Sequence, residues 1–301
     1  MSKLDKTMVD RDIKKVNQKH RVVKIFSQIL IYTFLILMAI IVIFPFFWMI
    51  SSSGMSLEEY KIPDKSLFRS LFPETPHFRD NYISAFTTAS LGRLFLNTLF
   101  VGVVSTVLSL VITVLSAFAF ARLEFKGKNA MFAALLATMM IPGELFTITN
   151  YVTVVNLHWQ KTFTVLIVPF LVSVFYIYLL RQNFLQIPNE LYLAAKVDGT
   201  SDIKYLWKVM IHLSLPTLIS ITILKMMGAW NSYVWPRLVA NDDAHRLITN
   251  GLRNAFTEST GDVNIPVQMA AVAIVSFPLF LVFIFLRKYI MKGVSRSGIK
   301  G

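Results

Sequence analysis

Hydrophobic residues gather along this chain in six long blocks, and polar segments containing proline, glycine or charge separate the blocks. Each block has about twenty residues or more, the length with which an α-helix crosses roughly 30 Å of hydrocarbon. The pattern therefore predicts an all-α, polytopic membrane protein with six transmembrane helices. Their expected ranges are 25–50, 94–121, 130–151, 162–180, 214–236 and 267–286.

Composition agrees with this interpretation and excludes several other classes. The 301 residues are 55% hydrophobic and 16% charged, whereas soluble domains average about 45–50% apolar and about 25% charged residues. The net charge of +13 does not predict nucleic-acid binding, because lysines and arginines flanking the spans account for it. The chain has no cysteine, so disulfides and thiol chemistry are excluded.

Lysines and arginines are distributed unequally between the two ends of the spans. Eight precede residue 25 and twelve more follow the second, fourth and sixth spans, against nine in the segments on the other side. The positive-inside rule then places both termini in the cytoplasm. We therefore expect a basic cytoplasmic tail at 1–24, the first transmembrane helix at 25–50, an external loop at 51–93, a membrane core at 94–290 and a cytoplasmic tail at 291–301.

The cytoplasmic segment at 181–213, between the fourth and fifth spans, has a pattern of its own. It contains ELYLAAKVDGTSDIKYLWKVMI, in which Glu190 lies near the start of a short helix that follows Pro188. Gly199 is expected to end that helix, and Thr200 or Ser201 to cap a second one. The residues leave two interpretations open: a connector between spans, or a docking element whose alanines allow another protein's backbone to approach.

These residues resemble the signature of permease subunits of ABC transporters. In that family a cytoplasmic Glu-Ala-Ala is followed by three residues and a glycine, and Ala194, Ala195 and Gly199 stand in that register. The wider stretch is similar to the second membrane subunit of maltose-type carbohydrate importers. Further matching stretches extend the resemblance over nearly the whole chain from about residue 25, namely FPFFWMISSS, NTLFVGVVSTVLSLVITVLSAFAFARLEFKGK, MMIPGELF, WNSYVWP and LRKYIMKGVSRSGIKG.

The resemblance implies that segment 181–213 contains a coupling helix that docks on a separate ATP-binding subunit. Two residues depart from the signature: Leu193 replaces the usual glutamate, and His212 stands where a proline is expected, although Pro216 follows. Glu190, one turn before Leu193, is a candidate substitute for the missing carboxylate. The residues expected at the ATPase interface are Glu190, Leu193, Ala194, Ala195, Asp198 and Gly199.

The implied function is the membrane subunit of an importer for carbohydrates, with di- or oligosaccharides as the expected solutes. Its implied partners are a second permease, a dimer of ATP-binding subunits, an external solute-binding protein and the lipid bilayer. The chain has no G-x-x-x-x-G-K-[ST] phosphate loop, so we expect no cofactor on it and expect ATP and Mg²⁺ to bind the partner ATPase. Three alternatives remain: a permease for a non-sugar solute, a self-sufficient secondary transporter, and a membrane enzyme, for which no catalytic constellation is present.

Two charged residues fall within predicted spans. Lys225 lies about eleven residues into the fifth span, roughly 16 Å deep, where a charge costs about 2.5–3.5 kcal/mol or more. Glu144, after Pro142 and Gly143 in the third span, lies at a comparable depth, and the Pro-Gly pair predicts a kink there. Lys225 could pair with Glu144, contact the solute, or occupy a polar subunit interface.

The end of the fifth span is rich in aromatic residues and carries one amide, Asn231. Aromatic and amide groups suit sugar rings, but aromatic residues at span ends also form the ordinary interfacial belt. Asn231, Glu144 and Lys225 are the candidate residues of a translocation pathway, and Pro236 is expected to end the helix. The five histidines show no metal-binding spacing, so no metal site is expected.

Overall fold

The computed structural model describes residues 3–62, 71–258 and 263–295, and the side chains of 24–62, 71–256 and 263–287. The described residues form helices and no strands, which confirms the predicted all-α class. The helices are α1 (Lys3–Ser53), α2 (Leu57–Lys61), α4 (Phe78–Thr88), α5 (Leu91–Arg122), α6 (Lys128–Thr138), η1 (Gly143–Phe146), α7 (Thr147–Asn156), α8 (Phe163–Ile167), η2 (Val168–Phe170), α9 (Val174–Leu185), α10 (Asn189–Val197), α11 (Asp202–Tyr205), η3 (Leu206–Met210), α12 (Ile211–Leu213), α13 (Leu215–Trp230), α14 (Val234–Val239), α15 (Ile248–Arg253), η4 (Asn254–Glu258) and α16 (Ile265–Ser295).

The chain divides into two compact units, at 1–78 and 79–301. The first unit contains α1, which runs without interruption through the predicted tail and the first predicted span, and α2. Within α1, residues 24–53 are apolar and long enough to cross a membrane. The apolar side chains of this stretch are largely exposed, as expected for a surface that faces lipid or another subunit.

The second unit holds the other five predicted spans, and their helices differ in continuity. Two helices, α5 and α16, are long and apolar enough to span a bilayer by themselves. In three further cases, two consecutive helices joined by a bend are long and apolar enough only when they are taken as a pair. The described chain therefore has six apolar spans if each bent pair crosses the membrane once. The cytoplasmic location of both termini remains a prediction, because the length and composition of the helices do not determine which side of the membrane each end faces.

The bends fall where proline interrupts a helix. In the third predicted span the chain turns by 83° between α6 and η1, beside Pro142, so the kink expected there is present. In the fourth, the chain bends by 45° after η2, which contains Pro169. The third bend, of 81°, lies at Ser214 between α12 and α13, two residues before Pro216. The end of the fifth span departs from expectation, because α13 ends at Trp230 rather than at Pro236, which lies inside the separate helix α14. Proline is tolerated in the first turn of a helix, so Pro236 was a poor marker of the helix end.

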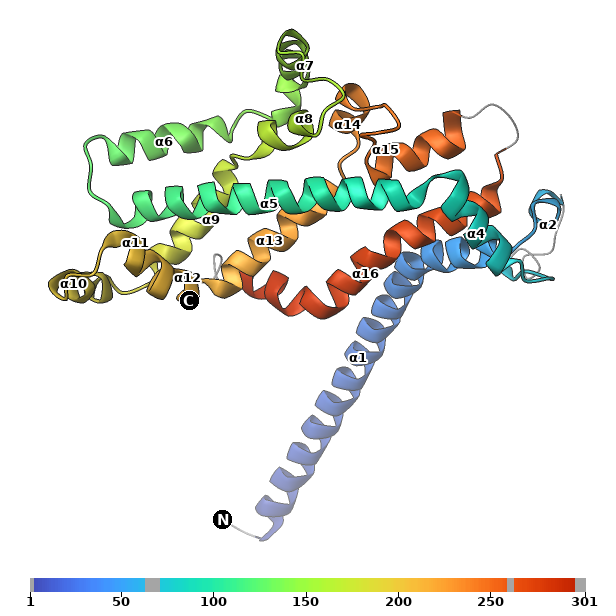
Figure 1. The fold of residues 1–301 in the computed structure, drawn as a ribbon. Coiled ribbons are helices and arrows are strands. Elements are labelled where there is room, and N and C mark those ends of the chain that lie inside the picture. The colour runs from blue at the N-terminus through green and yellow to red at the C-terminus, as the bar shows by residue number, and fades with distance from the viewer. Residues whose placement is uncertain (1–2, 63–70, 259–262, 296–301) are drawn as a thin grey trace. The chain divides into compact units, whose positions relative to one another are not determined.

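Helix α5 is the centre of the second unit (Figure 1). It packs against α9 and α13, and α13 packs against α16. Its buried side is a row of small residues spaced three or four apart, the pattern with which membrane helices approach closely. A Cβ atom added at Gly102 would lie 2.8 Å from the Met226 sulfur of α13. The row consists of Thr98, Gly102, Ser105, Thr106, Ser109, Thr113 and Ala117.

The two ends of α5 carry different polar segments (Figure 1). At its first turns, the Asn97 amide donates to the carbonyl oxygens of Ala244 and Arg246, and Thr98 accepts from the Ile248 N–H, which holds the segment 244–248 there. At its last turn lies the segment 181–213, over the apolar cluster that includes Phe184 and Tyr205. With 32 residues, α5 is about 48 Å long, more than the roughly 30 Å of a hydrocarbon core. The two segments therefore lie on opposite sides of the span.

Candidate functional site

Helix α10 packs a narrow face on the protein and is otherwise exposed to solvent. Tyr192 and Ala195 are half-buried against the cluster beneath α10. The other seven residues of α10 are exposed, and four of these recur at the helical spacing i, i+3, i+4 and i+7, which places those four on one face. They are Glu190, Leu193, Ala194 and Val197, and we call them the outward face of α10.

This arrangement divides the residues expected at the ATPase interface into two groups. Glu190, Leu193 and Ala194 lie on the outward face, and Asp198 and Gly199 are exposed at its end. Ala195 instead faces the protein. The outward face is apolar at Leu193 and at Val197, whose side chain is 88% exposed, and Glu190 lies one turn before Leu193, where it can present a carboxylate in place of the signature glutamate.

Gly199 ends α10 in a left-handed conformation, with φ of +69°. The Gly199 N–H donates to the Lys196 carbonyl at 3.0 Å, and the Thr200 N–H donates to the Ala195 carbonyl at 2.8 Å. These two bonds form a Schellman motif, which satisfies the last carbonyls of the helix. Ser201 then caps α11 by accepting from the Lys204 N–H, so the predicted helix, turn and second helix are all present.

A small polar network fixes α10 against α11 across this turn. Both the Tyr192 hydroxyl and the Lys196 ammonium donate to Oδ1 of Asp202, each at 2.7 Å. The hydrogen bond to Asp202 raises the pKa of Lys196. The Tyr192 and Tyr205 rings lie 5.2 Å apart between centroids. The network holds the turn in one geometry, so the outward face is presented in a fixed orientation.

We expect the substitution Gly199→Ala to lower the free energy of unfolding by about 1–2 kcal/mol, because a Cβ atom is strained in the left-handed region. A Cβ atom at Gly199 meets no other atom within 4 Å, so the effect is backbone strain and not a clash. Thermal unfolding of the purified protein measures it. Gly143→Ala is the matched control, since its Cβ also meets nothing within 4 Å and its φ is not positive. Equal stability of the two variants would contradict this account.

Arg122, the last residue of α5, connects that helix to the start of α10. Its Nη2 donates to the carbonyl oxygens of Phe184 at 2.9 Å and Ile187 at 2.5 Å, and its Nη1 donates to Oδ1 of Asn189 at 3.5 Å. Phe184 lies in the last turn of α9, Ile187 lies in the turn that follows it, and Asn189 is the first residue of α10. The guanidinium is buried, at 8% exposure, and it caps the negative end of α9. Sequence reasoning counted Arg122 only as a topology signal.

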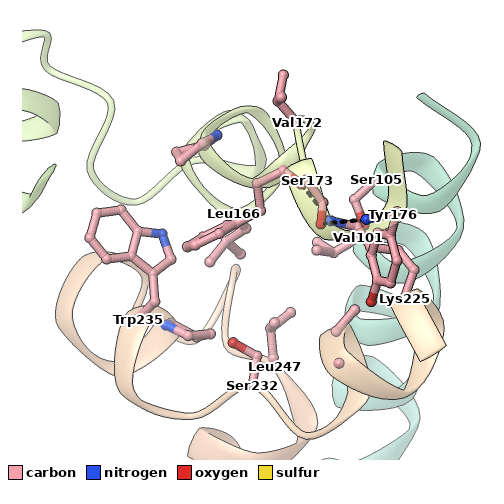
Figure 2. A pocket seen from close by; sticks show the side chains of 15 residues that line it. Val101, Ser105, Leu166, Val172, Ser173, Tyr176, Lys225, Ser232, Trp235 and Leu247 are labelled. Carbon is pink, nitrogen blue, oxygen red and sulfur yellow. Dashed lines mark hydrogen bonds between the residues drawn. The ribbon is translucent and has the colours of Figure 1, made fainter. Parts of the chain in front are cut away.

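A cavity of about 450 Å³ lies beside the middle of α5, between the bend after η2 and the end of α13. Figure 2 shows Trp235 on one side of it and Tyr176 and Lys225 on the other. The lining is partly apolar and partly hydroxylic, a mixture typical of ligand sites. The hydroxyl-bearing residues are Ser105, Ser173, Tyr176 and Ser232.

Side chains from other helices satisfy the backbone carbonyls that the bend leaves free. Pro169 has no N–H to donate to the Val165 carbonyl four residues earlier, and Trp235 Nε1 donates to that oxygen instead, at 2.9 Å. The Lys225 ammonium donates to the carbonyl oxygen of Phe170. Irregular backbone at membrane depth is tolerated when it lines a cavity or is buried in protein, and this bend meets the first condition, since Pro169, Phe170 and Val172 line the cavity.

Of the three residues expected in a translocation pathway, the structure places Lys225 alone in the cavity lining. Glu144 is exposed in η1, and no ion pair in the described residues joins it to Lys225. Asn231 is exposed at the C-terminal end of α13, next to the lining residue Ser232. Among the aromatic neighbours of Asn231, Trp235 lines the cavity, whereas Trp230 packs in an apolar cluster. The proline in the fourth span is the signal that would have pointed to this region.

The long apolar helices and the bent pairs are those of a polytopic helical membrane protein with a cavity beside its central helix. Residues 109–296 match the family model of binding-protein-dependent transport system inner membrane components. The chain therefore belongs to this family of ABC transporter permeases, and its location is the cell membrane.

Individual relatives share most of the chain. It is 31% identical over 223 residues to the arabinooligosaccharides transport system permease protein AraQ of Halalkalibacterium halodurans, and the alignment covers 74% of this chain and 79% of that protein. It is 30% identical over 279 residues to the sn-glycerol-3-phosphate transport system permease protein UgpE of Rhizobium meliloti, and that alignment covers 89% of this chain and 96% of UgpE. A chain in the crystal structure of a bacterial ABC transporter involved in the import of the acidic polysaccharide alginate has the same fold, with a TM-score of 0.80, 22% identity, and 88% of this chain and 96% of that chain covered.

Proposed function

We propose that this chain is one of two membrane-spanning subunits of an ATP-driven ABC importer for carbohydrates, with di- or oligosaccharides as its expected solutes. A second permease completes the pore, two ATP-binding subunits supply the energy, and an external solute-binding protein delivers the sugar. This chain couples ATP hydrolysis by its partner to a conformational change of the pore between inward-facing and outward-facing states. The relatives named for arabinooligosaccharide and glycerol-phosphate transport support a hydroxyl-rich solute.

The observation that carries the proposal is the outward face of α10 in a chain of this family. Leu193 and Val197 are apolar and exposed, and the Schellman turn, the Asp202 network and Arg122 hold the helix that bears them. A rigid helix with exposed apolar residues fits the groove of another protein, because little ordering entropy is lost on docking. The ATP-binding subunit is the partner proposed for this face.

Affinity purification of the tagged chain from gently solubilised native membranes tests the assembly. We expect a second permease of the same family and an ATP-binding subunit to copurify, and expect the complex to hydrolyse ATP faster when a sugar-loaded binding protein is added. A chain that purifies alone or as a homo-oligomer, with no ATP-binding subunit, would overturn the proposal and favour a self-sufficient transporter.

A further inference from the structure

The cavity beside α5 contains a positive charge that forms no ion pair with any residue the structure describes. Among the described residues that line it, Lys225 is the one charged residue and none is a carboxylate. Within the part of the chain that the structure describes, the hydrogen-bond acceptor of its ammonium is the Phe170 carbonyl. An ammonium has three N–H donors, so two remain for a further acceptor.

The position of Lys225 makes an unneutralised charge costly. It lies ten residues after Leu215, the first residue of α13, or about 15 Å along the helix axis and near the middle of a bilayer core. A lysine at that depth costs about 2.5–3.5 kcal/mol or more. Charged residues inside the membrane usually face a charged partner, a backbone carbonyl or a substrate pathway. Among the described residues, Lys225 bonds to the Phe170 carbonyl and forms no ion pair.

The rest of the lining suits a sugar carrying an anionic group. The Ser105, Tyr176 and Ser232 hydroxyls can donate to or accept from ring hydroxyls. Trp235, on the side opposite Lys225 and Tyr176, brings an indole whose N–H is already bonded to Val165 (Figure 2). Its ring therefore acts as an apolar wall. A volume of about 450 Å³ is within the range of small-ligand sites, roughly 300–1,000 Å³.

We propose that the cavity beside α5 binds the anionic group of an acidic saccharide, a carboxylate or a phosphate, with Lys225 as its counter-charge. The importer would then transport acidic sugars in preference to neutral ones. This inference rests on the proposed function, since it names the solute class of the same permease. Lys225 acts as a specificity-determining residue. It has a structural role as well, because it donates to the Phe170 carbonyl, and an arginine at this position can make that bond.

Matched pairs of sugars in proteoliposomes test the inference. The full complex contains the partner permease, the ATP-binding subunits and the binding protein. Its uptake of oligogalacturonides is compared with its uptake of their carboxyl-reduced counterparts, and its uptake of a sugar phosphate with that of the dephosphorylated sugar. We expect uptake of one acidic member to exceed its neutral counterpart. Lys225→Met should lower that uptake roughly tenfold or more, the effect of losing one charge-assisted hydrogen bond, while Lys225→Arg retains most of it. If the acidic member of the galacturonide pair is preferred, the cavity recognises a carboxylate, and if the sugar phosphate is preferred, it recognises a phosphate.

The exposed Lys126→Met variant removes a charge of the same type and is expected to leave uptake unchanged. Uptake of neutral sugars with no preference for acidic ones, unaffected by Lys225→Met, would overturn the inference and leave the proposed importer function intact. Uptake of no sugar by an assembled, ATP-hydrolysing complex would overturn both. If Lys225→Met and Lys225→Gln prevent assembly with the second permease while Lys225→Arg assembles, the charge is neutralised by that subunit and the inference is wrong.

Discussion

The Arg122→Met variant is expected to lose most ATP-driven transport and to unfold at a clearly lower temperature. Methionine removes the donors to the Phe184 and Ile187 carbonyls and leaves both acceptors without those bonds in a buried environment. The cost is about 3 kcal/mol, since hydrogen bonds to charged groups contribute about 1.5–3 kcal/mol each and do not add fully. The same change frees the end of α9 and the start of α10 from α5. Thermal unfolding and sugar uptake by the reconstituted complex measure the two effects.

Lys126→Met is the control for the Arg122 variant, because it removes a positive charge from an exposed residue of the loop that follows α5. It should keep both stability and uptake. Arg122→Lys should recover part of the stability, since an ammonium can donate to one carbonyl but lacks the planar fork of donors. An Arg122→Met complex that unfolds and transports like the parent would show that the contacts at the end of α5 do not position α10.

The Val197→Asp variant is expected to abolish coupling to the ATP-binding subunit without unfolding this chain. Val197 is 88% exposed, so the aspartate is fully solvated in the separate chain. In a docked complex the carboxylate would lie in an apolar interface, where losing one central contact costs about 2 kcal/mol or more, roughly thirtyfold in affinity. Copurification of the ATP-binding subunit and sugar-stimulated ATP hydrolysis measure the loss.

Leu157→Asp is the control for the Val197 variant. Leu157 is also an exposed apolar residue, at 51%, and it lies in the turn after α7, away from the coupling segment. This variant should retain the ATP-binding subunit. If the Val197→Asp complex keeps its ATP-binding subunit and its stimulated hydrolysis, the outward face of α10 is not the docking surface.

The continuous spans were predictable from the sequence because hydrophobic length alone defines them. The ranges expected for the second and sixth spans correspond closely to α5 and α16. The third to fifth spans are each broken, and hydropathy does not register a break when the residues on both sides are apolar. Pro142 gave a usable signal for the first break, whereas Pro236 misled because proline also fits the start of a helix.

The candidate site was predictable where local chemistry determines it. Gly199 and Ser201 mark a helix end and a helix start through their own backbone and side-chain preferences, and the structure has both. The contacts of Arg122 join residues more than sixty positions apart in the chain, and their acceptors are backbone carbonyls, which leave no trace in the residue types. The partner of Lys225 was missed for the same reason: it is the carbonyl of Phe170 and not the carboxylate of Glu144.

Uptake of labelled oligosaccharides by proteoliposomes is the most direct test of the proposed function. The vesicles contain this chain, its partner permease and the ATP-binding subunits, with the binding protein outside and ATP sealed inside. The account predicts accumulation that requires ATP, the binding protein and this chain together. Accumulation that continues without ATP and follows an ion gradient, by this chain alone, would contradict it and identify a secondary transporter.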